Sequence, residues 1–123
     1  MIPAYLYLNA ALYALFALWC TVSAAATARA IGYLQFNSGG ESEYRVIYGG
    51  LQLGLALVFA LLARRSELWE MGLVFSLAIY VPIVFYRVAT IASFWPVPPT
   101  TLAVGAMELT LLVVAGILWV ATH

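Results

Sequence analysis

Five polar or charged side chains stand out inside long apolar stretches of this sequence: Arg45, Gln52, Tyr80, Arg87 and Glu108. Guanidinium groups donate hydrogen bonds and carboxylates accept them, so Arg87 and Glu108 could pair with each other or hold the polar part of a ligand. Glu108 could act as a general acid or base only if its surroundings kept it protonated. With one His and one Cys in the chain, we predict no metal, no other cofactor and no Ser-His-Asp or Cys-His catalytic centre.

The composition indicates that these residues belong to a membrane protein. Hydrophobic residues make up 66% of the 123 residues and charged residues 8%, whereas roughly a quarter of the residues of a soluble domain are charged. Five basic and five acidic residues give no net charge, which does not favour nucleic acid as a partner. The lipid bilayer is the expected partner, and residues 1–123 are expected to form a single domain.

Apolar runs separated by turn signals predict four membrane spans, at about residues 4–28, 44–63, 69–92 and 100–121. "NSGG" and "RRSE" mark two of the connections, and the prolines of "FWPVPP" end the third helix. Ser42 is the expected N-cap of the second helix. The predicted fold class is all-α, an integral membrane antiparallel four-helix bundle with short loops.

The distribution of arginines predicts the orientation of this bundle. Arg64 and Arg65 are adjacent in a short turn, whereas Arg29 is the arginine of the opposite connection. The positive-inside rule therefore favours the cytoplasm for this turn and for both termini.

Each predicted helix carries one stripe of polar or small residues at a spacing of 3.6 residues per turn. These stripes include Arg45, Gly49 and Gln52 on the second helix, Tyr80 and Arg87 on the third, and Glu108 on the fourth. Lipid does not favour such faces, so we expect them to turn inward. Gln52, Arg87 and Glu108 lie about 8 to 12 Å from the outer ends of their helices, which predicts one polar cluster in the outer half of the bundle.

Two interpretations of this cluster remain open. In the first, a pocket that is open to the outer face binds or transports a small polar or amphipathic molecule, or a lipid, and is lined by Arg45, Tyr48, Gln52, Tyr80, Arg87 and Glu108. In the second, the chain is a structural or interaction protein whose buried Arg87/Glu108 pair only fixes helix packing. An enzyme that uses Glu108 is ranked last, because nearby arginines favour its ionised form.

Gly50 and Gly54 form a G-x-x-x-G on the side of the second helix away from Arg45. Glycines at this spacing let two helices approach closely. The contact is expected either within the chain or with a second copy, in a homo-oligomer.

A short motif opens the second predicted helix, in the order E-x-R-x-x-Y-G-G, and consists of Glu43, Arg45, Tyr48, Gly49 and Gly50. With this motif, and with Arg87 and Glu108 in its later helices, the chain resembles a family of small four-helix bacterial inner-membrane proteins classed as a domain of unknown function. The resemblance covers essentially the whole chain. It implies the fold and a location in the bacterial inner (plasma) membrane, and it implies no catalytic role.

Overall fold

The structure is a computed structural model that describes all 123 residues, Met1–His123, and it is helical throughout, with no strands. Four of its helical segments are long and apolar enough to cross a membrane: Ile2–Val22, Ser38–Ala63, Ser66–Ser93 and Pro99–Thr122. The prediction of an all-α protein with four long apolar helices is therefore confirmed.

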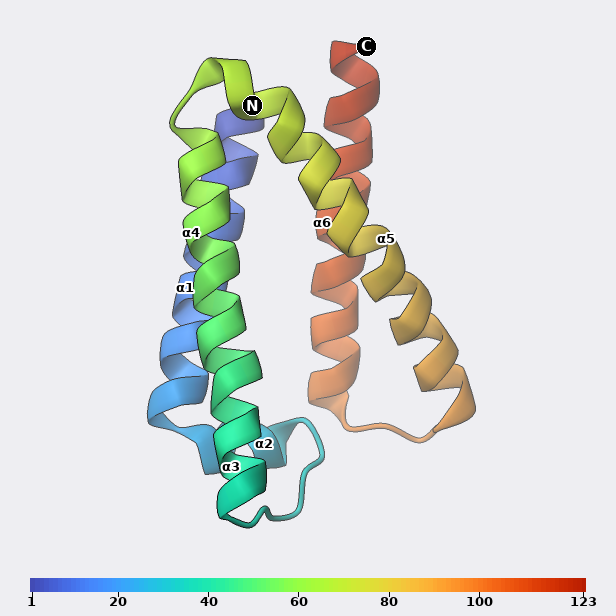
Figure 1. The fold of residues 1–123 in the computed structure, drawn as a ribbon. Coiled ribbons are helices and arrows are strands. Elements are labelled where there is room, and N and C mark those ends of the chain that lie inside the picture. Colours follow the sequence, from blue (N-terminus) through green and yellow to red (C-terminus); the bar gives the residue numbers. More distant parts are fainter.

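The chain forms six α-helices and two short helices of other types. In order they are α1 (Ile2–Val22), α2 (Ala24–Ala30), α3 (Ser38–Arg45), the π-helix η1 (Val46–Leu51), α4 (Gln52–Ala63), the 3-10 helix η2 (Ser66–Leu68), α5 (Trp69–Ser93) and α6 (Pro99–Thr122). Both termini and the turn after α4 lie at one end of the molecule, which we call the terminal end (Figure 1). α2, α3 and the connection from α5 to α6 lie at the opposite end, the loop end (Figure 1).

The long helices pack as two pairs. α1 lies along α4, and α5 lies along α6, whereas contacts between the two pairs are much sparser. The pairs meet near the terminal end and separate toward the loop end, where α5 leans away from α4 (Figure 1). This separation divides the molecule into a closed terminal half and an open loop half.

The main core lies in the terminal half and draws on all four long helices. It consists of Tyr5, Leu6, Phe59, Ala63, Leu73, Tyr80, Leu111 and Ala115. Gly72 brings α5 close to α1, because a Cβ at this position would lie 2.6 Å from Leu6 Cδ1. Such close approach gives the two helices dispersion contacts that a larger side chain would prevent.

A buried hydrogen-bonded network links α1 to α5 and α6 in the same half. The Tyr80 hydroxyl donates to Asn9 Oδ1, and Asn9 Nδ2 donates to the carbonyl oxygen of Tyr5 at 2.9 Å. The Tyr5 hydroxyl donates to the carbonyl oxygen of Leu111 at 2.8 Å. Asn9 and Tyr80 are fully buried, so these bonds satisfy groups that water cannot reach.

The first predicted span, 4–28, is not one continuous helix. α1 ends at Val22, and Ser23 has φ −119° and ψ 51°, outside the helical region, before α2 begins. The Thr21 hydroxyl donates to the carbonyl oxygen of Ala17 at 2.6 Å, a type of bond that bends helices. The break falls at Thr21, Val22 and Ser23, which are weaker helix formers than the alanines that follow, but no Gly or Pro marks the interruption.

The second helical segment begins at Ser38, ahead of the predicted start near residue 44. Asn37 is the N-cap in place of Ser42, because Asn37 Oδ1 accepts a hydrogen bond from the backbone N–H of Gly40 at 2.8 Å. The glycines of "NSGG", expected in a turn, therefore lie in the first turn of α3.

Candidate functional site

A π-helix shapes one wall of the site. In η1, the wider i→i+5 turn places one extra residue between Arg45 and Gln52 and so rotates their faces relative to each other. Gly49 lets this turn press against α1, since a Cβ there would lie 2.5 Å from Thr21 Oγ1. Tyr48 and Gln52 line the space between the helix pairs as a result, whereas Arg45 does not.

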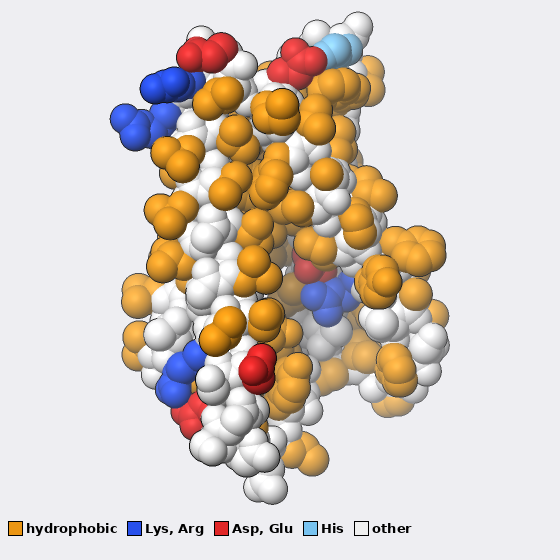
Figure 2. Space-filling model, viewed as in Figure 1, with side chains coloured by type: hydrophobic (Ala, Val, Ile, Leu, Met, Phe, Trp, Pro, Cys, Tyr) orange, Lys and Arg blue, Asp and Glu red, His pale blue; other side chains and the backbone are white.

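A pocket of about 640 Å³ lies between the helix pairs in the loop half. Figure 2 shows it as a hollow that holds a basic and an acidic side chain and is bordered by hydrophobic ones. All four long helices and α2 contribute to its 23 lining residues, 14 of which are hydrophobic. Its aromatic wall consists of Tyr13, Phe16, Trp19, Tyr33, Tyr44, Tyr48 and Phe94. The volume falls within the range of small-molecule sites, roughly 300 to 1,000 Å³.

Arg87 and Glu108 are the only charged residues that line the pocket. Arg87 Nε donates to Glu108 Oε1 at 2.7 Å, and Arg87 Nη2 donates to Oε2 at 3.1 Å, so the pair is bidentate. The side chains are 31% and 13% exposed, which leaves one edge of the pair open to the pocket. Nη1 of Arg87 makes no hydrogen bond within the protein.

Gly105 gives the side chain of Arg87 room beside α6, and no sequence pattern marks this role. It lies on α6 one turn before Glu108, and a Cβ there would lie 3.1 Å from Arg87 Cγ. A Cβ at Gly105 would therefore require the stem of Arg87 to shift by a few tenths of an ångström.

The Gln52 side chain lines the pocket, and its amide makes no hydrogen bond within the protein. Its Oε1 is the only buried side-chain nitrogen or oxygen atom of the protein that lacks a hydrogen-bond partner. An unpaired buried acceptor costs roughly 1 to 3 kcal/mol, so native structures seldom keep one without a donor from water or a ligand. The Gln52 amide and Arg87 Nη1 therefore have no partners within the protein, although Oε1 itself is covered and a ligand would reach it only if the amide rotated.

The structure brings four of the six predicted site residues to one pocket: Tyr48, Gln52, Arg87 and Glu108. Arg45 lies outside it, on the exposed surface, where its Nη1 donates to Glu41 Oε1 at 2.6 Å and its Nε to the carbonyl oxygen of Thr21 at 3.2 Å. The extra residue of η1 explains this displacement from the face of Gln52.

Tyr80, the sixth predicted site residue, is fully buried in the terminal half and does not line the pocket. Its hydroxyl donates a hydrogen bond to Asn9 Oδ1 on α1. Tyr80 and Arg87 lie on one stripe of α5, as predicted. The helix pairs diverge between these two positions, so Tyr80 lies in the core and Arg87 lies in the pocket (Figure 1).

Gly50 and Gly54 contact no other helix of the chain, because a Cβ at either position would meet no atom within 4 Å. The close contacts within the chain involve Gly49 and Gly72 instead. The contact of Gly50 and Gly54 with a second copy stays a prediction.

Sequence reasoning also missed the aromatic end of the pocket. The Tyr44 hydroxyl donates to Thr27 Oγ1 at 2.9 Å, and the Tyr44 ring stacks on Tyr48 with centroids 4.5 Å apart. Tyr33 packs edge-on against Tyr44 at 5.9 Å. Tyr44 lies four residues before the predicted site residue Tyr48 on one helical segment, whereas Thr27 and Tyr33 come from α2 and the connection after it, so no periodic pattern connects them to this pair.

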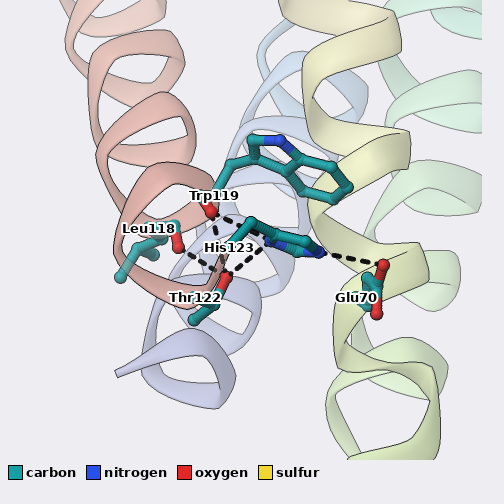
Figure 3. A network of polar contacts seen from close by, with 5 residues as sticks. All are labelled: Glu70, Leu118, Trp119, Thr122 and His123. Carbon is teal, nitrogen blue, oxygen red and sulfur yellow. Dashed lines mark hydrogen bonds and ion pairs between the residues drawn. The ribbon is translucent and has the colours of Figure 1, made fainter.

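A separate polar network lies at the terminal end (Figure 3). His123 Nε2 lies 3.1 Å from Glu70 Oε1, Nδ1 lies 3.0 Å from the carbonyl oxygen of Trp119, and the imidazole stacks on the Trp119 ring. The Glu70 carboxylate, and then the Trp119 carbonyl, raise the pKa of His123 above its ordinary value of 6.5. This exposed network ties the end of α6 to the start of α5, and none of its residues lines the pocket.

No cluster of three or more His, Cys, Asp or Glu side chains is placed to hold a metal ion. No protein-family model, curated protein or solved structure matches the chain.

Proposed function

We propose that the chain is a multi-pass membrane protein whose loop-half pocket binds a small amphipathic molecule. The four long apolar segments of 21 to 28 residues support membrane insertion, since about 20 residues of helix span the hydrocarbon core. Their arrangement supports an antiparallel bundle with the pocket in one half of the membrane.

The orientation follows from the charges at the two ends. Arg64 and Arg65 lie in the turn at the terminal end, which supports a cytoplasmic position for this end and an outward position for the pocket. The resemblance to small four-helix membrane proteins supports the bacterial inner membrane as the location.

The unpaired Gln52 Oε1 is the observation that carries the binding proposal. The Gln52 side chain lines the same pocket as the free Nη1 of Arg87, so a rotation of the amide toward the pocket would offer a ligand both an acceptor and a donor. The rest of the wall is mostly apolar. A ligand that matches a few polar groups in a mostly apolar wall has a compact polar head and an apolar remainder.

The apolar remainder has a route out of the pocket. Figure 2 shows the hollow opening on the face between the helix pairs, with hydrophobic side chains along its border. On α5, Phe85 and Val88 are 71% and 63% exposed, as expected for a face that meets lipid tails. A chain that leaves the pocket here would pass directly into the bilayer.

The bidentate ion pair favours a second candidate, a structural role in which Arg87 and Glu108 fix α5 against α6. That role accounts for the 2.7 Å contact but not for a cavity of about 640 Å³ beside it. Binding alone is proposed, since the pocket lies in the loop half and a packed core occupies the terminal half. Catalysis is not proposed, since Glu108 is the only carboxylate that lines the pocket and Arg87 occupies both of its oxygens.

Native mass spectrometry in a non-ionic detergent tests this proposal with monooleoylglycerol as the probe. The wild type is expected to retain one molecule per chain, and Val104→Trp, which fills the pocket, is expected to retain none. Val113→Trp places the same side chain on the half-exposed face of α6 and should bind like the wild type. Equal retention by Val104→Trp, or no retention by the wild type, would overturn the proposal, and Gln52→Leu provides a second variant if Val104→Trp misfolds.

A further inference from the structure

The charges of the pocket restrict the head group that it can accept. Arg87 and Glu108 are its only charged lining residues, and they neutralise each other at 2.7 and 3.1 Å. A ligand with a net charge would be attracted by one member of the pair and repelled by the other at similar distances. The two interactions largely cancel, so they would not offset the loss of water around that charge.

The free hydrogen-bonding groups point to the same class of head group. Gln52 Oε1 needs a donor, and Arg87 Nη1 needs an acceptor. A hydroxyl or an amide supplies both in one small group and requires no charge. A carboxylate, sulfate or phosphate can accept from Gln52 Nε2 and Arg87 Nη1 but has no donor for Gln52 Oε1, and an ammonium has no acceptor for Arg87.

An anionic head faces an additional obstacle. To bind Arg87 bidentately, it would have to displace Glu108, whose side chain is 13% exposed and would then be left unpaired. Separating a mostly buried pair leaves an uncompensated charge and is strongly unfavourable. We therefore expect the ion pair to stay intact and neutral when a ligand binds, and not to act as an anion-binding site.

We infer that the ligand of this pocket is an amphiphile with an electrically neutral head that carries hydroxyl or amide groups, a conclusion that rests on the proposed binding function. Gln52 and Arg87 bind the head, and the paired carboxylate of Glu108 excludes anions that Arg87 alone would attract. Glu108 is thus a specificity-determining residue, and Arg87 performs the same role against cations.

Three oleyl amphiphiles with different heads test the inference: monooleoylglycerol, oleyl sulfate and oleyltrimethylammonium. The protein contains two glutamines, the pocket residue Gln52 and the exposed Gln35. Glutamine labelled with 15N therefore gives two pairs of side-chain amide signals, one reporting on the pocket and one serving as an internal control. Titration at constant pH and detergent concentration gives the half-saturation point for each amphiphile from the Gln52 shift.

Monooleoylglycerol is expected to saturate the Gln52 shift at a concentration at least tenfold lower than either charged amphiphile. In Glu108→Met the preference should move to oleyl sulfate, and in Arg87→Met to oleyltrimethylammonium, because each variant leaves one charge in the pocket. Equal or tighter binding of a charged amphiphile by the wild type would overturn the neutral-head inference and leave the proposed binding function standing. A Gln52 signal that responds to none of the three would overturn both.

Discussion

The two halves of this molecule use polar residues in opposite ways. In the terminal half, Asn9, Tyr80 and Tyr5 bond to one another and to the backbone, and no buried polar side-chain atom is left unpaired. In the loop half, Gln52 Oε1 is buried without a partner and Arg87 keeps one nitrogen free beside a cavity. The first arrangement assembles helices, whereas the second leaves hydrogen-bonding capacity that the protein does not use.

The difference shows that polar residues within apolar helices do not all indicate the same thing. What separates the two classes here is whether the hydrogen-bonding capacity is used up inside the protein. Tyr80 and Gln52 are both polar residues on inward faces, yet Tyr80 has a partner on α1 and Gln52 Oε1 has none. Two comparisons of variants test this distinction, and two more test the packing and the polar contact of the terminal half.

The largest effect on stability is expected from breaking the ion pair. Arg87→Met leaves Glu108 without its partner, which should lower the free energy of unfolding by roughly 2 to 3 kcal/mol, less than for a completely buried pair because Arg87 is 31% exposed. The double variant Arg87→Met/Glu108→Met should recover most of this loss, since no charge stays unpaired. Unfolding by dodecyl sulfate in mixed micelles measures both, and equal losses in the single and double variants would contradict the ion-pair account.

The second comparison matches one polar residue from each half. Asn9→Leu removes the partner of the Tyr80 hydroxyl and should destabilise the protein by about 2 kcal/mol, because a buried donor is left unpaired. Gln52→Leu removes an acceptor that has no partner, so its stability should stay within about 0.5 kcal/mol of wild type. The same unfolding assay applies, and a larger loss for Gln52→Leu than for Asn9→Leu would reverse the assignment of the two halves.

The third comparison concerns packing in the terminal half. Gly72→Val forces a side chain into the space occupied by Leu6 and should cost about 1 to 2 kcal/mol. Gly116→Val on α6 meets no atom within 4 Å at its Cβ and should be neutral within about 0.5 kcal/mol. Thermal unfolding followed by circular dichroism distinguishes them, and equal midpoints would show that the terminal half is not tightly packed at Gly72.

The smallest effect is expected at the exposed His123–Glu70 contact. The pKa of His123 is raised in the folded protein, so this contact stabilises the fold fully below pH 6.5 and is lost as the pH rises through the raised pKa. NMR titration of the single imidazole should give a midpoint above 6.5 that falls in Glu70→Gln. Glu67→Gln alters a nearby acid that does not contact His123 and serves as the control. An unchanged midpoint in Glu70→Gln would exclude Glu70 as the cause.

The sequence predicts the four long helices well, because their apolar length alone determines them. It also brings Gln52, Arg87 and Glu108 together correctly, since residues at similar depths on inward faces meet when the helices pack. All three residues lie in α-helices: Gln52 begins α4, Glu108 lies within α6, and Arg87 lies within α5, which continues past its interior Pro82.

The failures occur where the backbone departs from regular geometry. Arg45 was expected on the same helix face as Gln52, but η1 changes the register between them. The break at Ser23 and the aromatic wall around Tyr44 depend on contacts between α1, α2 and α3 that no local pattern encodes. Tyr80 is on the inward face of its helix, as predicted. The helix pairs diverge only beyond Tyr80, and the position of that divergence cannot be predicted from which face a residue occupies.

The most direct test of the central claim is an intermolecular NOE experiment on the wild-type protein with monooleoylglycerol in deuterated detergent. If the loop half binds the amphiphile through its free polar groups, the glycerol protons give NOEs to the side-chain amide of Gln52 and the ring of Tyr48, and none to the side-chain amide of Asn9. NOEs confined to lipid-facing residues such as Val113, with none to Gln52, would contradict the account.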